Sequence, residues 1–262
     1  MEHIYQPIYK ELKQVKENIE VILNDLSFAS EYVSVYFNTQ AKNIRPCLVI
    51  TCAKAMNDNL ENDFDLLKKL CNFAASLELI HTASLIHDDI MDHEKYRRGQ
   101  ISLNNKYGCD RAVLLGDMLY TRTLKFINDT LGSDILDQII DVIDDMCKGQ
   151  FLEIDAKNFN KQKYLDMITL KTGSLIKLSC EGIFLIDNNI NKKYMKNFNE
   201  YGMSLGILYQ LIDDIKDGDG KFKLTLNEID NFAIKAKSSL THISNSIYKT
   251  KLLEFVDNVS SI

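Results

Sequence analysis

The stretch LIHDDIMDHEKYRRG, residues 85–99, gathers three aspartates and two arginines. These residues are Asp88, Asp89, Asp92, Arg97 and Arg98. Asp88 and Asp92 are four residues apart, so on a helix their side chains share one face and are separated by a single turn. Like charges at this spacing repel each other, so we expect the cluster to carry a cation. Hard oxygen ligands at an aqueous mouth suit Mg²⁺, which commonly bridges carboxylates to the phosphates of a substrate.

A second acidic stretch, YQLIDDIKD, covers residues 209–217 and repeats the aspartate spacing. Its aspartates are Asp213, Asp214 and Asp217. Each cluster follows an apolar helical run, LELIHTASLI before the first and GMSLGILYQLI before the second. A single DDxxD is typical of a solvated helix end, but two copies that both end apolar helices favour a functional pair. We therefore predict two helices whose acidic ends face each other across a cavity.

The composition predicts a globular, helical protein. Of 262 residues, 45% are hydrophobic and 26% are charged, which is normal for a folded domain. With 2 Pro and 11 Gly, little interrupts the chain, so long helices are expected. The net charge of −6 argues against a nucleic-acid-binding surface.

Six cysteines are scattered along the chain without a CxxC pair. They are Cys47, Cys52, Cys71, Cys109, Cys147 and Cys180. This spacing predicts buried free thiols in a reducing compartment and does not fit a disulfide or zinc framework. The first residues show no apolar signal region, and no run of about 18 apolar residues occurs. We expect a soluble, cytoplasmic protein.

Apolar residues recur at helical spacing through most of the chain. Residues 4–24 show an amphipathic pattern, and residues 64–91 are helical and nearly continuous. Further helices are predicted at residues 28–40, 47–56, 108–130, 132–158, 162–186, 192–217, 227–237 and 239–258. No strand alternation, repeat or linker is visible, so residues 1–262 are predicted to form one all-α domain of about nine or ten helices.

The segment QAKNIRP, residues 40–46, brings two basic residues to a helix start. Pro46 fits the first position of the following helix and disfavours helical geometry at the residue before it. Lys42 and Arg45 are therefore expected on a loop that enters a helix N-terminus, where an anion can be held. The alternative is an exposed basic pair without a ligand.

Two residues inside predicted helices are further candidates. His81 precedes Asp88 by seven residues, which places both on one helical face two turns apart. A lone helical histidine is more often structural than a ligand, so both interpretations stay open. Gly173 destabilises a helix by about 1 kcal/mol relative to Ala, and we expect a kink there that exposes a backbone carbonyl.

From about residue 40 to 217 the chain resembles the trans-isoprenyl diphosphate synthases of the polyprenyl synthetase family. HDDIMDHEKYRRG is similar to the family's first aspartate-rich motif with its two trailing arginines. AVLLGDMLY (112–120), KGQFLEID (148–155), KTGSLI (171–176) and YQLIDDIKD are similar to the later signatures, in order. The resemblance implies a single-domain isoprenoid synthase bundle around a central apolar cavity, two to three Mg²⁺ ions per site, and a homodimer without nucleic acid or an integral membrane segment.

The resemblance also implies roles for individual residues. The metal ligands would be Asp88, Asp92, Asp213, Asp214 and Asp217, with Asp89 in support. The allylic substrate would be surrounded by Arg97, Lys171, Thr172 and Gln210. The diphosphate of isopentenyl diphosphate would be held by Lys42, Arg45, His81 and Arg98. The residues implied in catalysis are Asp88, Asp89, Asp92, Arg97, Lys171 and Asp213.

The implied reaction condenses an allylic diphosphate with isopentenyl diphosphate. Mg²⁺ between the acidic clusters neutralises the departing pyrophosphate, and the double bond of isopentenyl diphosphate attacks the resulting carbocation. By the same resemblance, pyrophosphate takes up the proton that is then lost. An apolar cavity excludes water, which would quench the cation.

Three departures from the family pattern are expected to affect activity. QAKNIRP replaces the usual GGKRxRP, which predicts weaker binding of isopentenyl diphosphate, and RRGQIS mildly alters RRGxPT. Fewer residues follow the second acidic motif than is usual in the family, where a lysine-bearing loop closes over the allylic diphosphate. Lys221 or Lys223 could substitute for that lysine.

Product length in this family is set by the wall below the first motif. The fifth and fourth residues before Asp88 are Ala83 and Ser84, and neither is bulky. The resemblance therefore favours a medium- or long-chain product, with a farnesyl or geranylgeranyl diphosphate synthase as the alternative. Deeper aromatic residues that could form a floor are Tyr120, Phe126 and Phe151.

Three other functions remain open at this point. A class I terpene cyclase shares the implied fold but normally carries a different second metal motif. A non-catalytic partner subunit of a heteromeric synthase has no need of six clustered aspartates. A helical scaffold with solvated acidic faces is the third alternative.

Overall fold

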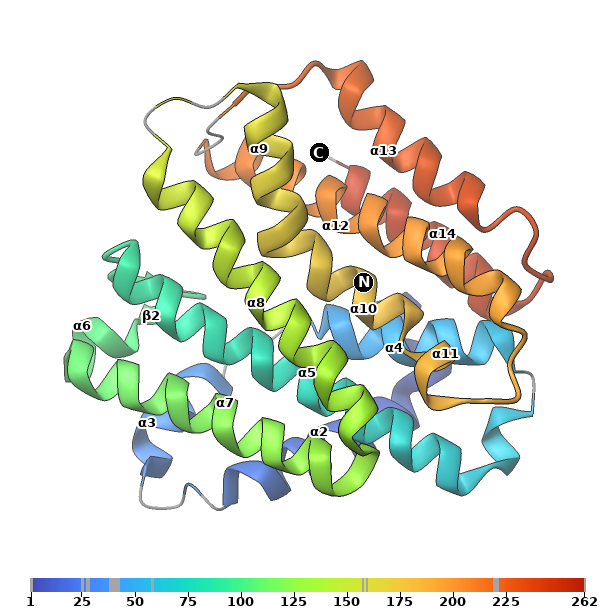
Figure 1. Cartoon of the computed structure of the whole chain (residues 1–262), viewed down its shortest axis with the longest axis horizontal. Coiled ribbons are helices and arrows are strands. Elements are labelled where there is room, and N and C mark those ends of the chain that lie inside the picture. Colours follow the sequence, from blue (N-terminus) through green and yellow to red (C-terminus); the bar gives the residue numbers. More distant parts are fainter. Residues whose placement is uncertain are drawn as a thin grey trace.

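The protein, seen here in a computed structural model, is a bundle of α-helices with a short β-hairpin (Figure 1). The structure describes residues 2–24, 26, 29–37, 43–57, 59–156, 158, 160–218 and 222–261. The all-α class predicted from the sequence is confirmed. Among the described helices, none combines the length and the apolar character needed to span a bilayer.

The predicted helical ranges are divided by short breaks into more segments than expected. The first segments are α1 (Glu2–Tyr5), α2 (Tyr9–Asn24), α3 (Ser30–Phe37), α4 (Ile44–Met56) and α5 (Phe64–Met91). The middle segments are α6 (Leu103–Tyr107), α7 (Cys109–Leu131), α8 (Ser133–Asp155) and α9 (Lys161–Ile168). The last are α10 (Ser174–Glu181), α11 (Ile183–Ile186), α12 (Met195–Asp217), α13 (Leu226–Ser239) and α14 (Ile247–Ser260). Short 3-10 turns are η1 (Gln6–Ile8), η3 (Leu60–Asn62) and η5 (Lys192–Tyr194).

Helix α5 is the central element and packs against α2, α4 and α7. It starts at Phe64, where the side chain of Asp63 accepts a hydrogen bond of 3.0 Å from the Leu66 amide and caps the helix. Every residue from 70 to 80 is buried, as expected for a helix that is apolar on all sides. In Figure 1, α5 crosses behind α8 through the middle of the bundle. Its C-terminal end carries the first acidic cluster out of the core.

Between α9 and α10 the helix continues through a π-helical segment, η4 (Thr169–Gly173). The sequence predicts an interruption at this point, and a π turn is a common form of it at functional sites. Two glycines allow neighbouring helices to approach η4 closely. A Cβ atom on Gly149 of α8 would lie 2.5 Å from the Lys171 amide nitrogen, and one on Gly206 of α12 would lie 2.8 Å from Gly173 Cα. Helices α8 and α12 therefore enclose η4 and fix the direction of its side chains.

The two arginines after the first cluster lie on a β-hairpin. Strand β1 (Tyr96–Arg97) pairs antiparallel with β2 (Gln100–Ile101). The turn residues Arg98 and Gly99 both have positive φ, 51° and 76°. Tight two-residue turns require this geometry, which glycine adopts without strain and other residues adopt rarely. The hairpin, which the helical pattern did not predict, folds the arginine pair back onto the acidic end of α5.

The predicted position of Arg45 is wrong. The sequence suggests a loop, but α4 begins at Ile44, so Arg45 lies in the first helical turn and is buried. Pro46 is tolerated there because amides of the first turn have no acceptor within the helix.

The prediction that all six cysteines are buried is also wrong. Cys109 and Cys147 are exposed, whereas Cys47, Cys52, Cys71 and Cys180 are buried, and all six are free. Lys42 and Lys221 lie outside the described residues.

A buried ion pair joins the N-terminal helix to the core. Lys54 of α4 and Glu11 of α2 are almost fully buried, with 2.7 Å between Nζ and Oε1. The exposed Glu61 binds the same ammonium at 2.8 Å, and the ring centroid of Tyr248 in α14 lies 5.4 Å away. Burial would lower the pKa of Lys54, but hydrogen bonds to both glutamates raise it above the usual value. This ammonium therefore joins α2, α4 and α14.

Replacing Lys54 by Met should lower the free energy of unfolding by about 3–5 kcal/mol, because it leaves the buried Glu11 carboxylate without its partner. Glu61→Gln, at the exposed end of the cluster, should have a much smaller effect, because solvent screens that contact. Urea unfolding followed by circular dichroism measures both. Removing both buried charges in Lys54→Met/Glu11→Leu should regain most of the loss. Equal effects of Lys54→Met and Glu61→Gln would contradict this account.

Candidate active site

A cavity of about 380 Å³ lies where α4, α5, η4, α12 and the hairpin meet. It unites most of the residues predicted from the sequence: Arg45, His81, Ser84, Asp88, Arg97, Arg98, Lys171, Thr172, Gln210 and Asp213. The first aspartate of each cluster, Asp88 and Asp213, lines this one cavity from a different helix. The predicted meeting of the two acidic helix ends is therefore present.

Asp88 is a half-buried carboxylate with both cationic and anionic side chains nearby. Burial raises its pKa from the ordinary value to about 6, and the nearby Asp92 and Glu153 act in the same direction. Lys171 and Arg97 act against this shift. The pKa of Lys171 is in turn raised: burial lowers it, but Asp88, a hydrogen bond to Glu153 and Asp92 outweigh burial. Lys171 thus stays cationic within the cavity.

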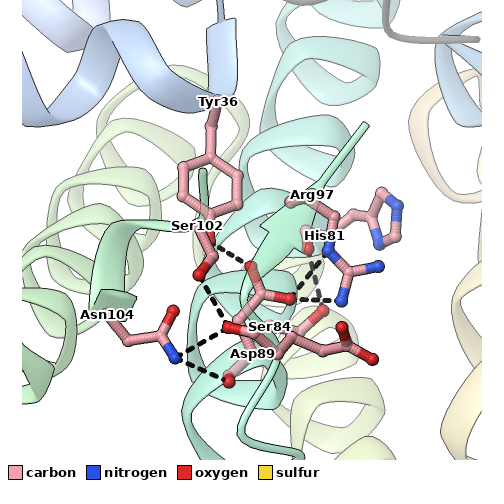
Figure 2. Close-up of polar contacts among 8 residues, drawn as sticks. Tyr36, His81, Ser84, Asp89, Arg97, Ser102 and Asn104 are labelled. Atoms are coloured by element: carbon pink, nitrogen blue, oxygen red, sulfur yellow. Dashed lines mark hydrogen bonds and ion pairs between the residues drawn. The ribbon is translucent and has the colours of Figure 1, made fainter. Parts of the chain in front are cut away.

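Asp89 has a different role from Asp88, and Figure 2 shows the contacts of Asp89. It is completely buried and accepts a 2.5 Å hydrogen bond from the Tyr36 hydroxyl on α3. Arg97 donates to its other oxygen through Nε at 2.7 Å and also through Nη2. The amide side chain of Asn104 donates to the Asp89 backbone carbonyl at 3.0 Å. Asp89 therefore joins α3, α5 and the hairpin and sets the position of Arg97.

Asp214 repeats this arrangement in the second cluster. The Tyr164 hydroxyl of α9 donates to one of its oxygens, and Gln210 Nε2 donates to the other at 2.6 Å. Thr172 Oγ1 donates to Gln210 Oε1 at 2.7 Å, which connects η4 to α12. In each cluster the first aspartate lines the cavity, whereas the second is held by a tyrosine from another helix.

Glu153 of α8 is a neighbour of Lys171 that the sequence did not single out. Its Oε2 atom accepts a hydrogen bond of 2.5 Å from Lys171 Nζ. Both side chains are about one fifth exposed, 19% and 22%, so the pair sits at the edge of the cavity. Glu153 holds the ammonium in place beside Asp88.

At the other end of the cavity, Arg45 lies close to Glu78, and both are buried. Arg45 Nε and Glu78 Oε2 lack a hydrogen-bond partner within the described residues. Burial raises the pKa of Glu78, and Arg45 partly offsets the effect. Burial, with Arg45, Arg98 and Arg97, lowers the pKa of His81 well below its usual value, so this imidazole is neutral at pH 7. This end is basic but holds one buried carboxylate.

Several predicted site residues do not line this cavity. Asp92 and Asp217 are exposed at the ends of α5 and α12, and Ala83 is fully buried in the core. Lys223 is exposed and lines a separate cavity with Tyr164. Lys42 is not among the described residues.

Several residues at or near the site have partners that are distant in the chain and were not predicted. These are Tyr36, Asn43, Glu78, Glu153, Tyr164 and Tyr209. Glu78 could have been noticed in the sequence, since it is an ionisable residue within the apolar run LELIHTASLI. The tyrosines could not have been identified, because their contacts depend on how whole helices pack together.

The acidic residues fit Mg²⁺ that is shared with a phosphate ligand. In the part of the chain that the structure describes, no group of three His, Cys, Asp or Glu side chains could hold a metal ion alone. Mg²⁺ usually takes one or two carboxylates and completes its shell with substrate phosphates and water. Asp88 and Asp213 offer this kind of donor on the two walls of one cavity.

A second cavity, of about 400 Å³, adjoins the first and is mostly apolar. Its lining comes from α5, α7 and α8 and includes Tyr120, Ile143, Met146, Phe151 and Ile154. In Figure 1, α7 and α8 diverge from their connection near Gly132, with α5 visible between them. Ser84, Asp88, Met146 and Lys171 line both cavities. An apolar tail could therefore extend from a head group bound in the first cavity.

The family model described as Polyprenyl synthetase matches residues 27–228, most of the chain. The chain belongs to the polyprenyl synthetase family. The matched range contains both acidic clusters, the hairpin and the helices that line the two cavities.

Named members of the polyprenyl synthetase family match the chain over about four fifths of its length. The all trans-polyprenyl-diphosphate synthase PDSS1 of Homo sapiens is 33% identical over 219 residues, which cover 80% of this chain and 51% of that protein. The short chain isoprenyl diphosphate synthase of Methanocaldococcus jannaschii is 30% identical over 227 residues, 84% of this chain and 65% of that protein. The chain thus spans between half and two thirds of the length of these relatives.

The fold agrees with solved structures of the polyprenyl synthetase family. A polyprenyl synthase from Caulobacter crescentus CB15, crystallised with calcium and isoprenyl diphosphate, superposes with a TM-score of 0.87. The alignment covers 100% of this chain and 97% of that chain at 20% sequence identity, so the likeness establishes the fold.

Replacing Asp88 by Asn should raise the thermal unfolding midpoint of the metal-free protein at pH 8. Because the pKa of Asp88 is raised to about 6, its ionised form destabilises the fold. The gain should be on the order of 1–3 kcal/mol, or several degrees. It should shrink as the pH falls from 6 toward 4, where the folded parent binds the proton. Calorimetry with a chelator, beside the exposed Asp137→Asn, tests this. An unchanged or lower midpoint at pH 8 would contradict it.

Proposed function

We propose that the protein is a trans-prenyltransferase that condenses an allylic diphosphate with isopentenyl diphosphate, head to tail. The observation that carries this proposal is the meeting of Asp88 and Asp213 at one cavity that also contains Lys171 and Arg97. Asp88 and Lys171 line the adjoining apolar cavity as well. The first cavity would hold the diphosphate head group of a substrate, and the adjoining apolar cavity would hold its prenyl tail.

The allylic diphosphate would bind between the two acidic clusters. Asp88 and Asp92 on one side and Asp213 and Asp217 on the other would hold Mg²⁺, which when bound neutralises the charge that develops on the leaving diphosphate. The Lys171 ammonium donates hydrogen bonds to the same phosphate oxygens. In a site with little bulk water, such contacts stabilise growing negative charge more than they do in solution.

Arg97 reaches the cavity from the hairpin and is fixed by the buried Asp89. This contact keeps the guanidinium in place before substrate arrives, so less ordering remains for the binding step. Thr172 and Gln210 line the cavity from η4 and α12 and are joined by a hydrogen bond. They would contact the allylic substrate near its reacting carbon.

The basic end of the cavity would hold the diphosphate of isopentenyl diphosphate. Arg98 and Arg45 supply positive charge, and within the described residues the Nε atom of Arg45 has no acceptor. His81, neutral because its pKa is lowered, would contribute a hydrogen bond rather than a charge. Lys42 belongs to the same group by family resemblance.

The apolar cavity would accept the growing chain and exclude water from the carbocation. Ser84 lines its wall, whereas Tyr120 and Phe151 are the aromatic residues that limit it. Ser84 is small and does not block the cavity, so a medium- or long-chain product is favoured. A cytoplasmic location belongs to the same proposal and is supported by the free cysteines.

Incubation with farnesyl diphosphate, isopentenyl diphosphate and Mg²⁺ should give products longer than twenty carbons. Asp88→Ala and Asp213→Ala should each lower the rate by about a hundredfold or more, because each removes charge-stabilising groups from the site. Chromatography of the dephosphorylated products measures both length and rate. Asp137→Ala, on the outer face of α8, is the matched control.

Each contrary outcome identifies a different function. Turnover without isopentenyl diphosphate would indicate a terpene cyclase. Activity that requires a second, different chain would indicate a subunit of a heteromeric synthase. Arrest at twenty carbons or fewer would indicate a short-chain synthase.

We also propose that the protein forms a homodimer through α7 and α8. Leu114 of α7 and Phe151 and Ile154 of α8 are 62%, 66% and 60% exposed, although all three are large and apolar. Phe151 and Ile154 line the apolar cavity, and Leu114 lies on α7, the helix that packs beside α8. Apolar clusters of this kind are typical of protein–protein interfaces. A second copy would cover them and close the side of the cavity.

Leu114→Glu/Ile154→Glu should convert a dimer into a monomer, because it places charge within the apolar interface. Light scattering after size-exclusion chromatography gives the mass directly. Ile234→Glu changes an equally exposed residue, 63%, on α13 and should leave the mass unchanged. A monomeric parent, or a double variant that remains dimeric, would contradict the proposed interface.

A further inference from the structure

One wall of the apolar cavity is a histidine ring packed on a glycine. His87 of α5 lines the cavity together with Tyr120 of α7. Their ring centroids are 5.9 Å apart. The His87 side chain is 27% exposed, so the imidazole is enclosed on one side and open on the other.

The enclosed side of the imidazole faces helix α7. His87 Nε2 lies 3.3 Å from the backbone carbonyl of Val113 and 3.6 Å from Asp117 Oδ1. Gly116 lies between these two residues. The polar contacts hold the ring against α7 at the level of the glycine.

Gly116 leaves no space for a side chain. A Cβ atom built there would lie 2.2 Å from His87 Nε2, 2.6 Å from Cδ2 and 2.9 Å from Cε1. Atoms of real proteins do not approach so closely, so the imidazole would have to move. Because α7 lies on one side of the ring and the ring also lines the cavity, a ring displaced from α7 would move toward the cavity.

The opposite wall of the cavity comes from α8 and includes Ile143, Cys147 and Phe151. The distance between the His87 ring and this wall limits the cross-section available to a prenyl chain. The family resemblance implies the same task for Ala83 and Ser84, of which Ser84 lines the cavity and Ala83 is buried outside it.

We propose that Gly116 and His87 act as one unit that determines product length. Gly116 lets the imidazole lie flat against α7 and keeps the cavity wide enough for a longer chain. A side chain at position 116 would push the ring into the cavity and stop elongation earlier. This inference rests on the proposed prenyltransferase function and adds a specificity-determining pair to it.

The test compares the products of Gly116→Ala, His87→Ala and the double variant with those of the parent, using isopentenyl diphosphate and farnesyl diphosphate. Gly116→Ala should shorten the dominant product by at least one isoprene unit. His87→Ala should lengthen it by at least one unit. In the double variant, the ring that would be displaced is absent, so the product should return to the parent length or exceed it.

Gly182→Ala is the control for general destabilisation. Its new Cβ would also lie 2.2 Å from a ring atom, Cε1 of Phe73, but that ring is fully buried and does not line the cavity. At a temperature where it remains folded, this variant should keep the parent's product length. A shortening in Gly182→Ala equal to that in Gly116→Ala would overturn the proposal.

Binding of thiodiphosphate analogues that cannot ionise provides a readout without turnover. Gly116→Ala should lose roughly tenfold affinity for a twenty-carbon analogue relative to a ten-carbon one, because the longer tail meets the displaced ring. If Gly116→Ala does not fold, the product length of His87→Ala alone tests the proposal, and an unchanged length would overturn it.

If the parent makes no elongated product, the proposed reaction fails. If Gly116→Ala then still binds the twenty-carbon analogue more weakly than the ten-carbon one, the role of the pair as a cavity wall stands.

Discussion

The buried carboxylate of Asp89 is the contact on which the geometry of the site depends. A charge without solvent exposure is stable in a protein when it is paired and hydrogen-bonded, and here Arg97 and Tyr36 provide this. The three groups come from α5, the hairpin and α3. Their pairing folds the hairpin onto the helix end and thereby places Arg97 and Arg98 on the cavity. Without this carboxylate, the hairpin would lose the contact that fixes Arg97 at the cavity.

The second cluster follows the same rule with different partners. Tyr164 and Gln210 hold Asp214, while Asp213 remains on the cavity. In both clusters, one of two adjacent aspartates lines the cavity and the other is held by hydrogen bonds from other parts of the fold. Burial raises the pKa of Asp88, and the nearby Asp92 and Glu153 add to this effect. The ionised form of Asp88 therefore reduces the stability of the metal-free protein, which is a common cost at functional sites.

Much of this arrangement could be predicted from the sequence, because helical periodicity is a local property. The range predicted for α5, residues 64–91, agrees with the observed helix at both ends, and the meeting of Asp88 and Asp213 follows from two matching helix ends. The sequence could not show that the first aspartate of each cluster lines the cavity while the second is held by hydrogen bonds. Spacing shows which face of a helix a residue occupies but not which partner it meets. Tyr36 and Asp89 are 53 positions apart, and Tyr164 and Asp214 are 50 apart, so tertiary packing decides both contacts. Arg45 was predicted on a loop because Pro46 was expected to delay the start of the helix. Proline does not prevent a helix when it lies in the first turn, where α4 places it.

The π-helical segment η4 has a consequence for how this chain can evolve. A π turn contains one residue more than an α turn, and each residue of a helix advances by about 100°. Deleting a single codon between Thr169 and Gly173 would let the segment relax into ordinary helix and rotate Lys171 and Thr172 away from the cavity that they line. Because the helix content would hardly change, far-ultraviolet circular dichroism would not detect this deletion. The number of residues in η4, and not only their identity, therefore determines where Lys171 and Thr172 point.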